Sequence, residues 1–256
     1  MGNQSIITRV TGNNFSDING TLNSNGANFL LINPHGVVFG TGVKLDVGKA
    51  FVTSTANGID FVDAQGRNYN FGVDRAGDAP LISIDRSVAF NPVRLIIGET
   101  IPGSKGIENY GALQTNNLGQ YVGLIGGDIT INGGIVFAPG GRVDLGGLKN
   151  AGTVATDSQG LVFLGNNLTR SDVSLTNGAL VNVQADLALG AVSTLFSNAS
   201  FSGSSINISA NNVRLINDLS TPNTNDSVLG AGLAENSGKK NISTGGININ
   251  ASGQKC

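Results

Sequence analysis

The feature that most constrains the fold of this chain is the recurrence of very short segments in which apolar residues flank one small or polar residue. Successive side chains of an extended strand point to opposite faces, so each segment presents two apolar side chains to one side. Gly, Asn and Asp interrupt these segments every few residues, which is typical of tight turns. The clearest segments are Ile129-Thr130-Ile131, Val143-Asp144-Leu145, Val173-Ser174-Leu175, Val181-Asn182-Val183, Leu187-Ala188-Leu189, Ile206-Asn207-Ile208 and Ile247-Asn248-Ile249.

Strands this short do not hold an open sandwich together, but they are natural in a coil where each strand pairs with its equivalent one turn above. The sequence therefore predicts an all-β fold, a right-handed single-stranded parallel β-helix (a solenoid) with hairpins outside the coil. Helix formers are scarce beside Gly and Asn, and no helical stripe appears. We expect Arg67 to Pro80 and Ser220 to Lys240 to leave the coil or to be partly disordered.

Composition limits the function of the chain. Charged residues make up 12% of it, and 15 Lys and Arg against 17 Asp and Glu give a formal net charge of −2. A nucleic-acid footprint needs clustered basic residues, so we expect no nucleic-acid partner. The longest apolar runs, such as Leu161 to Leu164, are far below the ~18 residues of a membrane span. A single cysteine, Cys256, leaves no metal-ligand spacing, and we expect no metal and no cofactor.

The densest motif lies near the start of the chain. An apolar strand, Phe29 to Ile32, precedes Asn33-Pro34-His35-Gly36, and Val37-Val38-Phe39-Gly40 follows. Asn caps such a loop, Pro presets φ, and Gly allows a positive φ. The residues alone therefore predict a strand-turn-strand unit. A second short turn, Asn19-Gly20, lies upstream.

These residues resemble the secretion domains of filamentous-haemagglutinin-like proteins of two-partner secretion. Those domains carry an Asn-Pro-Asn-Gly turn after an apolar strand, then Val/Ile-Phe-Gly and a Phe-Val-Ala-Ser-Thr-like segment. Here His35 replaces the second Asn, and Phe51 to Thr55 supply the later segment. A further block, from Leu124 to Gly146, resembles the cyanobacterial-type haemagglutinin-activity-domain branch of that family. The residues that we assign to its structural motif are Gly126, Gly127, Gly133, Gly134, Ala138, Pro139, Gly140, Gly141 and Arg142.

The resemblance implies that residues 1–217 form a two-partner secretion β-helix domain. We expect residues 218–256 to be a loop-rich, partly disordered continuation of it. No signal peptide is visible at the N-terminus, and the strands that cap the family's helix are missing, so we expect a truncated start. The family's route implies export through the periplasm of a Gram-negative bacterium to the cell surface or the medium.

The resemblance also implies a partner, an outer-membrane β-barrel transporter with periplasmic recognition domains. We expect the chain to be a monomer, and a host or cell-surface ligand is a further candidate partner. The positions implied for transporter recognition are Asn33, Pro34, His35, Gly36, Asn19 and Gly20.

Two other functions stay open. A purely structural surface filament would have no transporter partner. A carbohydrate-active β-helix enzyme would gather carboxylates in one groove, but no two of the candidates are adjacent in the sequence. We therefore expect no catalytic residue. The candidate carboxylates are Asp85, Asp128, Asp144, Asp172 and Asp186.

Two single residues are better explained by structure than by chemistry. His35 is the only histidine and has no cysteine or second histidine beside it, so we expect a structural role rather than a metal site. Arg142 lies two residues from Asp144 on the same face of a predicted strand, and we expect a local charge pair.

Overall fold

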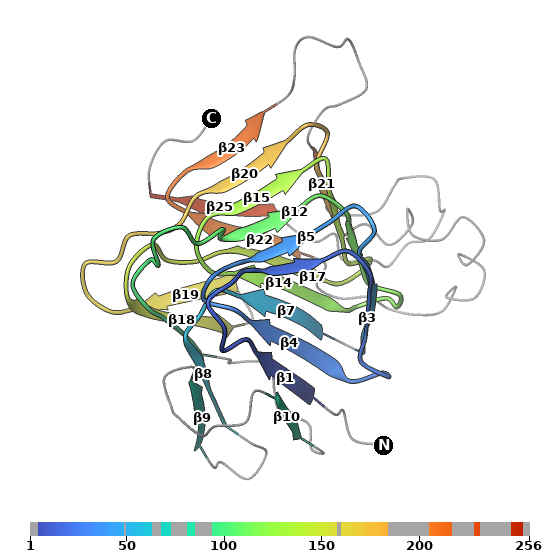
Figure 1. Ribbon diagram of the computed structural model, residues 1–256. Coiled ribbons are helices and arrows are strands. Elements are labelled where there is room, and N and C mark those ends of the chain that lie inside the picture. The colour runs from blue at the N-terminus through green and yellow to red at the C-terminus, as the bar shows by residue number, and fades with distance from the viewer. Residues whose placement is uncertain are drawn as a thin grey trace, which may run out of the picture.

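The computed structural model describes residues 5–48, 50–62, 68–72, 81–84, 94–157, 160–183, 205–216, 228–230 and 247–252 (Figure 1). These residues form strands, turns and bends, with no helix among them. Within the described ranges no helix is long and apolar enough to cross a membrane. Most strands pair in parallel, and the predicted all-β class is confirmed.

The chain visits three sides of the molecule in a fixed order, and we call each passage a circuit. The first side is sheet A, which opens each circuit. Its parallel strands are β1 (Ser5–Arg9), β4 (Asn28–Ile32), β7 (Ala50–Ser54), β14 (Tyr121–Ile125), β17 (Arg142–Gly146), β22 (Ser205–Ala210) and β25 (Ile247–Ala251). An antiparallel strand, β10 (Leu81–Ile84), pairs with the free edge of β1.

The second side, sheet B, receives the next strand of each circuit. Its strands are β2 (Ser16–Ile18), β5 (Val37–Phe39), β12 (Ile107–Asn109), β15 (Ile129–Asn132), β20 (Val173–Thr176) and β23 (Val213–Ile216). The third side holds two parallel sheets. The first is β3 (Thr21–Asn23) with β6 (Lys44–Asp46), and the second is β13 (Ala112–Gln114), β16 (Ile135–Phe137), β21 (Leu180–Asn182) and β24 (Val228–Gly230). Strand β6 lies beside β13.

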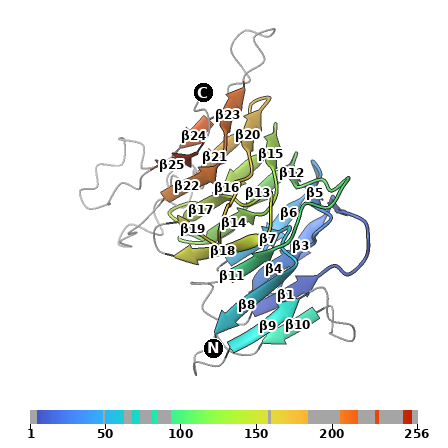
Figure 2. The same cartoon turned by 90° about the vertical axis from the view of Figure 1, so that its left-hand side faces the viewer.

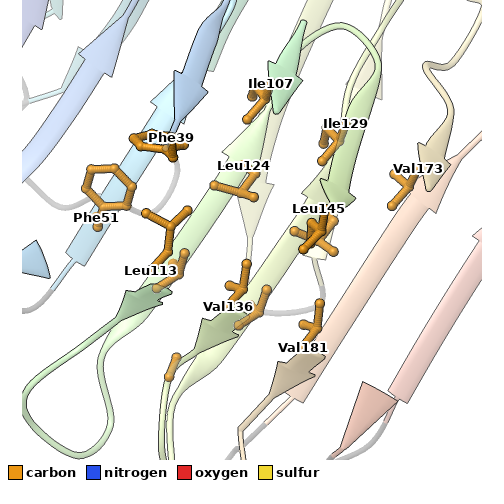
Figure 3. Packing of buried hydrophobic residues seen from close by; sticks show 14 of the residues in the cluster. Phe39, Phe51, Ile107, Leu113, Leu124, Ile129, Val136, Leu145, Val173 and Val181 are labelled. Carbon is orange, nitrogen blue, oxygen red and sulfur yellow. The ribbon is translucent and has the colours of Figure 1, made fainter. Parts of the chain in front are cut away.

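Constant register builds the main core between the three sides. Because each strand of sheet A pairs with the next without a shift, equivalent residues stack in columns. One inward-facing column runs Ile6, Phe29, Phe51, Val122, Val143, Ile206 and Ile247. The rings of Phe39 and Phe51 meet edge to face, with centroids 5.9 Å apart, and aliphatic residues from all three sides fill the rest (Figure 3).

A second layer covers the outer face of sheet A (Figure 2). It is a five-stranded antiparallel sheet in the order β19-β18-β11-β8-β9, inserted into the third and fifth circuits. Leu30, Ile32 and Val52 of sheet A pack against this layer in a second core with Leu95 and Val154. The strands β4, β7, β14 and β17 of sheet A are therefore buried on both faces. The strands of the layer are β8 (Gly58–Val62), β9 (Asn68–Gly72), β11 (Arg94–Ile97), β18 (Gly152–Asp157) and β19 (Gly160–Leu164).

Both stretches expected to leave the coil contain strands. Strand β9 lies within Arg67 to Pro80 and joins the outer layer, whereas β24 lies within Ser220 to Lys240 and continues the third side. The other residues of Ser220 to Lys240 lie outside the described residues, so the expectation for that stretch stays a prediction. The predicted strand at Leu187-Ala188-Leu189 lies outside the described residues.

One core position predicts a stabilising substitution. Thr53 is fully buried in the column between Leu31 and Leu124, and its hydroxyl has no hydrogen-bond partner among the described residues. Thr53→Val keeps the shape and removes the orphaned hydroxyl, so we expect the free energy of unfolding to rise by about 1 kcal/mol. Urea unfolding measures it. Thr130→Val, on the outer face of sheet B, is the control and should change little; a less stable Thr53→Val protein would contradict the prediction.

Candidate functional site

The turn Asn33-Pro34-His35-Gly36 forms the corner where the second circuit passes from β4 to β5. Its first and last residues are joined by a hydrogen bond from the Gly36 N–H to the Asn33 carbonyl oxygen, at 3.0 Å. The Asn33 side chain closes the same turn, because its Oδ1 accepts a hydrogen bond from the His35 N–H at 3.0 Å. The predicted strand-turn-strand unit is confirmed.

Asn33 also ties three circuits together. Its backbone N–H donates to the Ser54 carbonyl of the following circuit at 2.9 Å. Its Nδ2 donates to the Asn14 carbonyl at 3.0 Å and to Ser16 Oγ at 2.9 Å, both in the preceding circuit. The side chain is fully buried. In the folded protein Asn33 therefore stabilises the corner and offers no atom to a partner.

Gly36 is held in a conformation and a space that only glycine fits. Its φ is +108°, and an added Cβ would lie 2.8 Å from both the Gly106 carbonyl oxygen and Lys105 Cβ. The backbone of the next circuit approaches this closely because Val37 donates to the Gly106 carbonyl at 2.9 Å. Pro34 is buried, and His35 is half-buried with a buried Nδ1 that has no hydrogen-bond partner among the described residues.

Asn19 and Gly20 lie at a different corner, where the first circuit passes from β2 to β3. The structure therefore does not bring them together with the Asn33 turn. Asn19 Oδ1 accepts a hydrogen bond from the Gly42 N–H of the second circuit at 2.7 Å. Both Asn19 and Gly20 are exposed, so these two predicted positions stay accessible after folding.

The second motif block occupies all three corners of later circuits. Its glycines permit close stacking: a Cβ on Gly141 would lie 1.9 Å from the Gln120 carbonyl oxygen of the circuit below. Arg142 then begins β17. In chain order, Gly126 and Gly127 follow β14, Gly133 and Gly134 follow β15, and Ala138, Pro139, Gly140 and Gly141 follow β16.

The two motifs meet at one cavity of about 190 Å³. Pro34 of the first motif and Gly127 of the second both line it. Thr55 lies between them, and its Oγ1 accepts a hydrogen bond from the Gly127 N–H at 2.7 Å. The charged side chains of Asp128 and Lys149 also reach this cavity. The corner that carries Asn33 is thus continuous in space with the corner that carries Gly126 and Gly127.

A charge ladder extends along this corner. Lys149 Nζ lies 3.2 Å from Asp128 Oδ1 and 3.0 Å from Asp172 Oδ2. Asp172 Oδ1 accepts hydrogen bonds from the Asn212 N–H at 2.9 Å and from Asn211 Nδ2 at 3.2 Å. Burial acts to raise the pKa of Asp172, but the hydrogen bonds from Lys149 and Asn212 outweigh it and lower that pKa. Burial acts to lower the pKa of Lys149, but its bonds to Asp172 and Asp128 leave it raised.

A buried polar network lies on the outer face of sheet A. The expected pair is present: Arg142 Nε donates to Asp144 Oδ1 at 2.8 Å, and Asp144 is fully buried. Tyr121 Oη and Asn207 Nδ2 also donate to this carboxylate, at 3.0 and 2.8 Å. Burial and then the charge of Asp144 raise the pKa of Tyr121 well above its usual value. Arg142 further bonds the Asp157 carbonyl, which ties the outer layer to sheet A.

The three candidate carboxylates that the structure describes lie at two separate places. Asp128 and Asp172 share Lys149 at a corner, whereas Asp144 is buried beside Arg142 on the outer face of sheet A. Asp85 and Asp186 lie outside the described residues. In the part of the chain that the structure describes, no group of three His, Cys, Asp or Glu side chains is placed to hold a metal ion. Ion pairing gives Asp144 and Asp172 a structural role.

Sequence reasoning missed the charge ladder and the contacts of Asp144 beyond Arg142. Lys149 and Asp172 are 23 positions apart, and Asp144 and Asn207 are 63 apart. Asn207 stands opposite Asp144 in the next circuit, which becomes visible once the register is known. Lys149 and Asp172 belong to the same circuit, between β17 and β20, and nothing in the sequence signals their contact.

A family model described as the TPS secretion domain matches residues 2–197 of this chain. No curated protein and no solved structure matches it. The matched span contains the Asn33 corner, the second motif block and the cavity between them.

The Asn33 corner predicts a sharp difference between two glycines. Gly36→Ala should lower the free energy of unfolding by about 2 kcal/mol or more, because Cβ strains a positive φ and meets the next circuit. Gly20 has nothing within 4 Å of an added Cβ, so Gly20→Ala is the matched control. It should stay within about 1 kcal/mol of the wild type. Equal losses in urea unfolding would contradict the described corner.

The charge ladder predicts a pH dependence of stability. Because the pKa of Asp172 is lowered on folding, its contribution is fully present above the unfolded pKa of about 4 and is lost as the pH falls through the folded value. Asp172→Asn should therefore destabilise the protein at neutral pH, and the difference from the wild type should shrink on acidification. Urea unfolding at a series of pH values measures it, with exposed Asp17→Asn as the control. A difference that grows in acid would contradict the assignment.

Proposed function

Because this chain belongs to the TPS secretion domain family, which marks it as an exported substrate of two-partner secretion, we propose that its early circuits direct transport through an outer-membrane β-barrel partner. The partner would carry periplasmic recognition domains. The destination would be the cell surface or the medium of a Gram-negative bacterium, by way of the periplasm. The exported protein would act as an adhesin of the haemagglutinin-like kind, with a host or cell-surface ligand.

We further infer that the stacked circuits form a right-handed, single-stranded parallel β-helix. The fixed order of the three sides and the unshifted register of sheet A support this reading. The antiparallel outer layer would then be an addition to the helix, made by hairpins that leave the third and fifth circuits. We propose that the chain is a monomer.

The burial of Asn33 is the observation that carries the proposed mechanism. Its amide and backbone groups are consumed by bonds to Asn14, Ser16 and Ser54 when the circuits stack. Before folding, the same groups and the flanking strand edges are free to pair with the transporter's recognition domains by β-augmentation. Folding outside the cell then buries these groups and strand edges, so they no longer bind the recognition domains. This favours movement of the chain out of the cell.

Asn19 and Gly20 are proposed as a second recognition element that works differently. They remain exposed in the folded protein, so folding does not withdraw them from a partner. His35, Pro34 and Gly36 would act with Asn33 as one turn. The nine residues of the second motif block would serve the stacking of later circuits rather than recognition.

We propose no enzymatic activity. The buried pair of Asp144 with Arg142, and the sharing of Lys149 by Asp128 and Asp172, support structural roles for these carboxylates. A carbohydrate-active enzyme would instead need two carboxylates facing a substrate groove. The filament alternative has no transporter, so a secretion assay separates it from the proposed function.

The test is release of a tagged, signal-peptide-fused chain into the medium with and without the co-expressed transporter. We expect transporter-dependent release that falls sharply in Asn33→Ala. The matched control is Asn109→Ala, since Asn109 is also a fully buried corner amide, with bonds to Ile135 and Gly111 at 3.1 and 3.2 Å. Each substitution should cost about 1–3 kcal/mol of stability.

If Asn109→Ala is released like the wild type, the loss in Asn33→Ala reports recognition. An equal loss in both variants would reduce Asn33 to a stability role. Release without the transporter would overturn the proposed function.

A further inference from the structure

The chain contains five Asn-Gly pairs, and this dipeptide is where a polypeptide is most easily changed by water alone. They are Asn19-Gly20, Asn25-Gly26, Asn57-Gly58, Asn132-Gly133 and Asn177-Gly178. The glycine amide nitrogen can attack the preceding Asn side chain because no Cβ shields it. A folded protein reacts in this way only where the side chain is accessible and the glycine N–H is not held.

Two of the pairs are protected in their backbone. The Gly133 N–H donates to the Thr176 carbonyl at 2.9 Å, so its nitrogen is engaged. Gly58 is buried within β8 and pairs with Ile96 of β11 and Gly72 of β9. Attack at either position first requires a strand or corner to open.

Two more pairs are restrained through the Asn side chain. Asn19 Oδ1 accepts the bond from the Gly42 N–H, and the side chain packs against Gly40. Asn177 Nδ2 donates to Asn132 Oδ1 at 2.7 Å. Rotation of either carboxamide toward the following nitrogen breaks its hydrogen bond.

Asn25-Gly26 differs from the other four pairs. Both residues are exposed, and nothing lies within 4 Å of an added Cβ on Gly26. Among the described residues neither the Asn25 carboxamide nor the Gly26 N–H has a hydrogen-bond partner. Their φ angles of 51° and 81° place them at the centre of a two-residue turn, which is closed by a hydrogen bond from the Ala27 N–H to the Ser24 carbonyl at 3.0 Å.

We propose that Asn25 is a site of spontaneous deamidation, with water as the co-reactant. The Gly26 amide nitrogen, having given its proton to hydroxide, forms a bond to Asn25 Cγ. The bond from Cγ to the side-chain nitrogen breaks, and ammonia leaves after taking a proton from water. Water then adds to one carbonyl of the resulting succinimide and opens the ring to aspartate or isoaspartate.

The modification acts on the first corner that joins the third side to sheet A. It adds a negative charge close to Asp46, whose Oδ2 accepts a bond from Asn23 Nδ2 at 2.6 Å. Isoaspartate also lengthens the backbone by one methylene. That corner is closely stacked, because the Gly48 N–H donates to the Ala27 carbonyl at 2.6 Å and a Cβ on Gly48 would lie 2.2 Å from the Gly26 carbonyl oxygen. Deamidation therefore loosens the contact between the first two circuits.

The experiment incubates the purified full chain at mildly alkaline pH and follows each Asn-Gly peptide by mass spectrometry. We expect the mass gain of deamidation at Asn25 first, with Asn57 and Asn132 slower by about tenfold or more, since they react only from locally opened states. The urea-unfolded chain is the control, and there the five sites should react at similar rates. Asn25→Gln should remove the early signal from the folded chain.

Faster reaction at Asn19 or Asn177 than at Asn25 in the folded chain would overturn the proposal. So would an unmodified Asn25 under conditions in which the unfolded chain reacts.

Discussion

The structure depends on the unshifted parallel pairing of sheet A. When each strand repeats the register of the one before, every side chain stacks on its equivalent in the next circuit. Each position must therefore hold residues that pack well against residues of the same type. Aliphatic and aromatic residues satisfy this rule in the inward column from Ile6 to Ile247. Like charges would repel in such a column, which explains why the chain is poor in charge and rich in Asn, Ser and Thr. Where a charge does occur, as at Asp144, the neighbouring circuits supply Tyr121 and Asn207 as donors.

The corners follow from the same constraint. Strands that stack without shift bring the connecting turns into contact as well, and the backbones then approach too closely for side chains at several positions. Gly36 and Gly141 are two of these positions, and in both the obstacle is a carbonyl oxygen of the neighbouring circuit. The turn motif that is most recognisable in the sequence is therefore a stacking device in the folded protein, and Asn33 completes it by bonding to the circuits on either side.

Features that depend on residues close together in the sequence, such as single strands, could be predicted. Contacts between residues of different circuits could not. Alternation over three residues was enough to predict β15, β17, β20 and β22, and proximity on one strand was enough to pair Arg142 with Asp144. The outer layer could be expected only as separate hairpins, because its assembly needs β11 to pair with both β8 and β18, from two different circuits. Lys149 escaped notice for the same reason. A lysine among polar residues gives no sign that Asp128 and Asp172 flank it in space.

Burial of the most distinctive motif bears on how a secretion signal can work at all. A signal that is read in the folded state must remain exposed, whereas Asn33 and Pro34 are buried. A signal that is read in the unfolded state has the opposite requirement, since its burial on folding prevents the exported protein from competing for the transporter again. The hydrogen bonds of Asn33 to both neighbouring circuits suit the second case, because they form only when the adjacent circuits have stacked. The stability of the folded protein and the outward direction of transport would then both depend on the corner that carries Asn33.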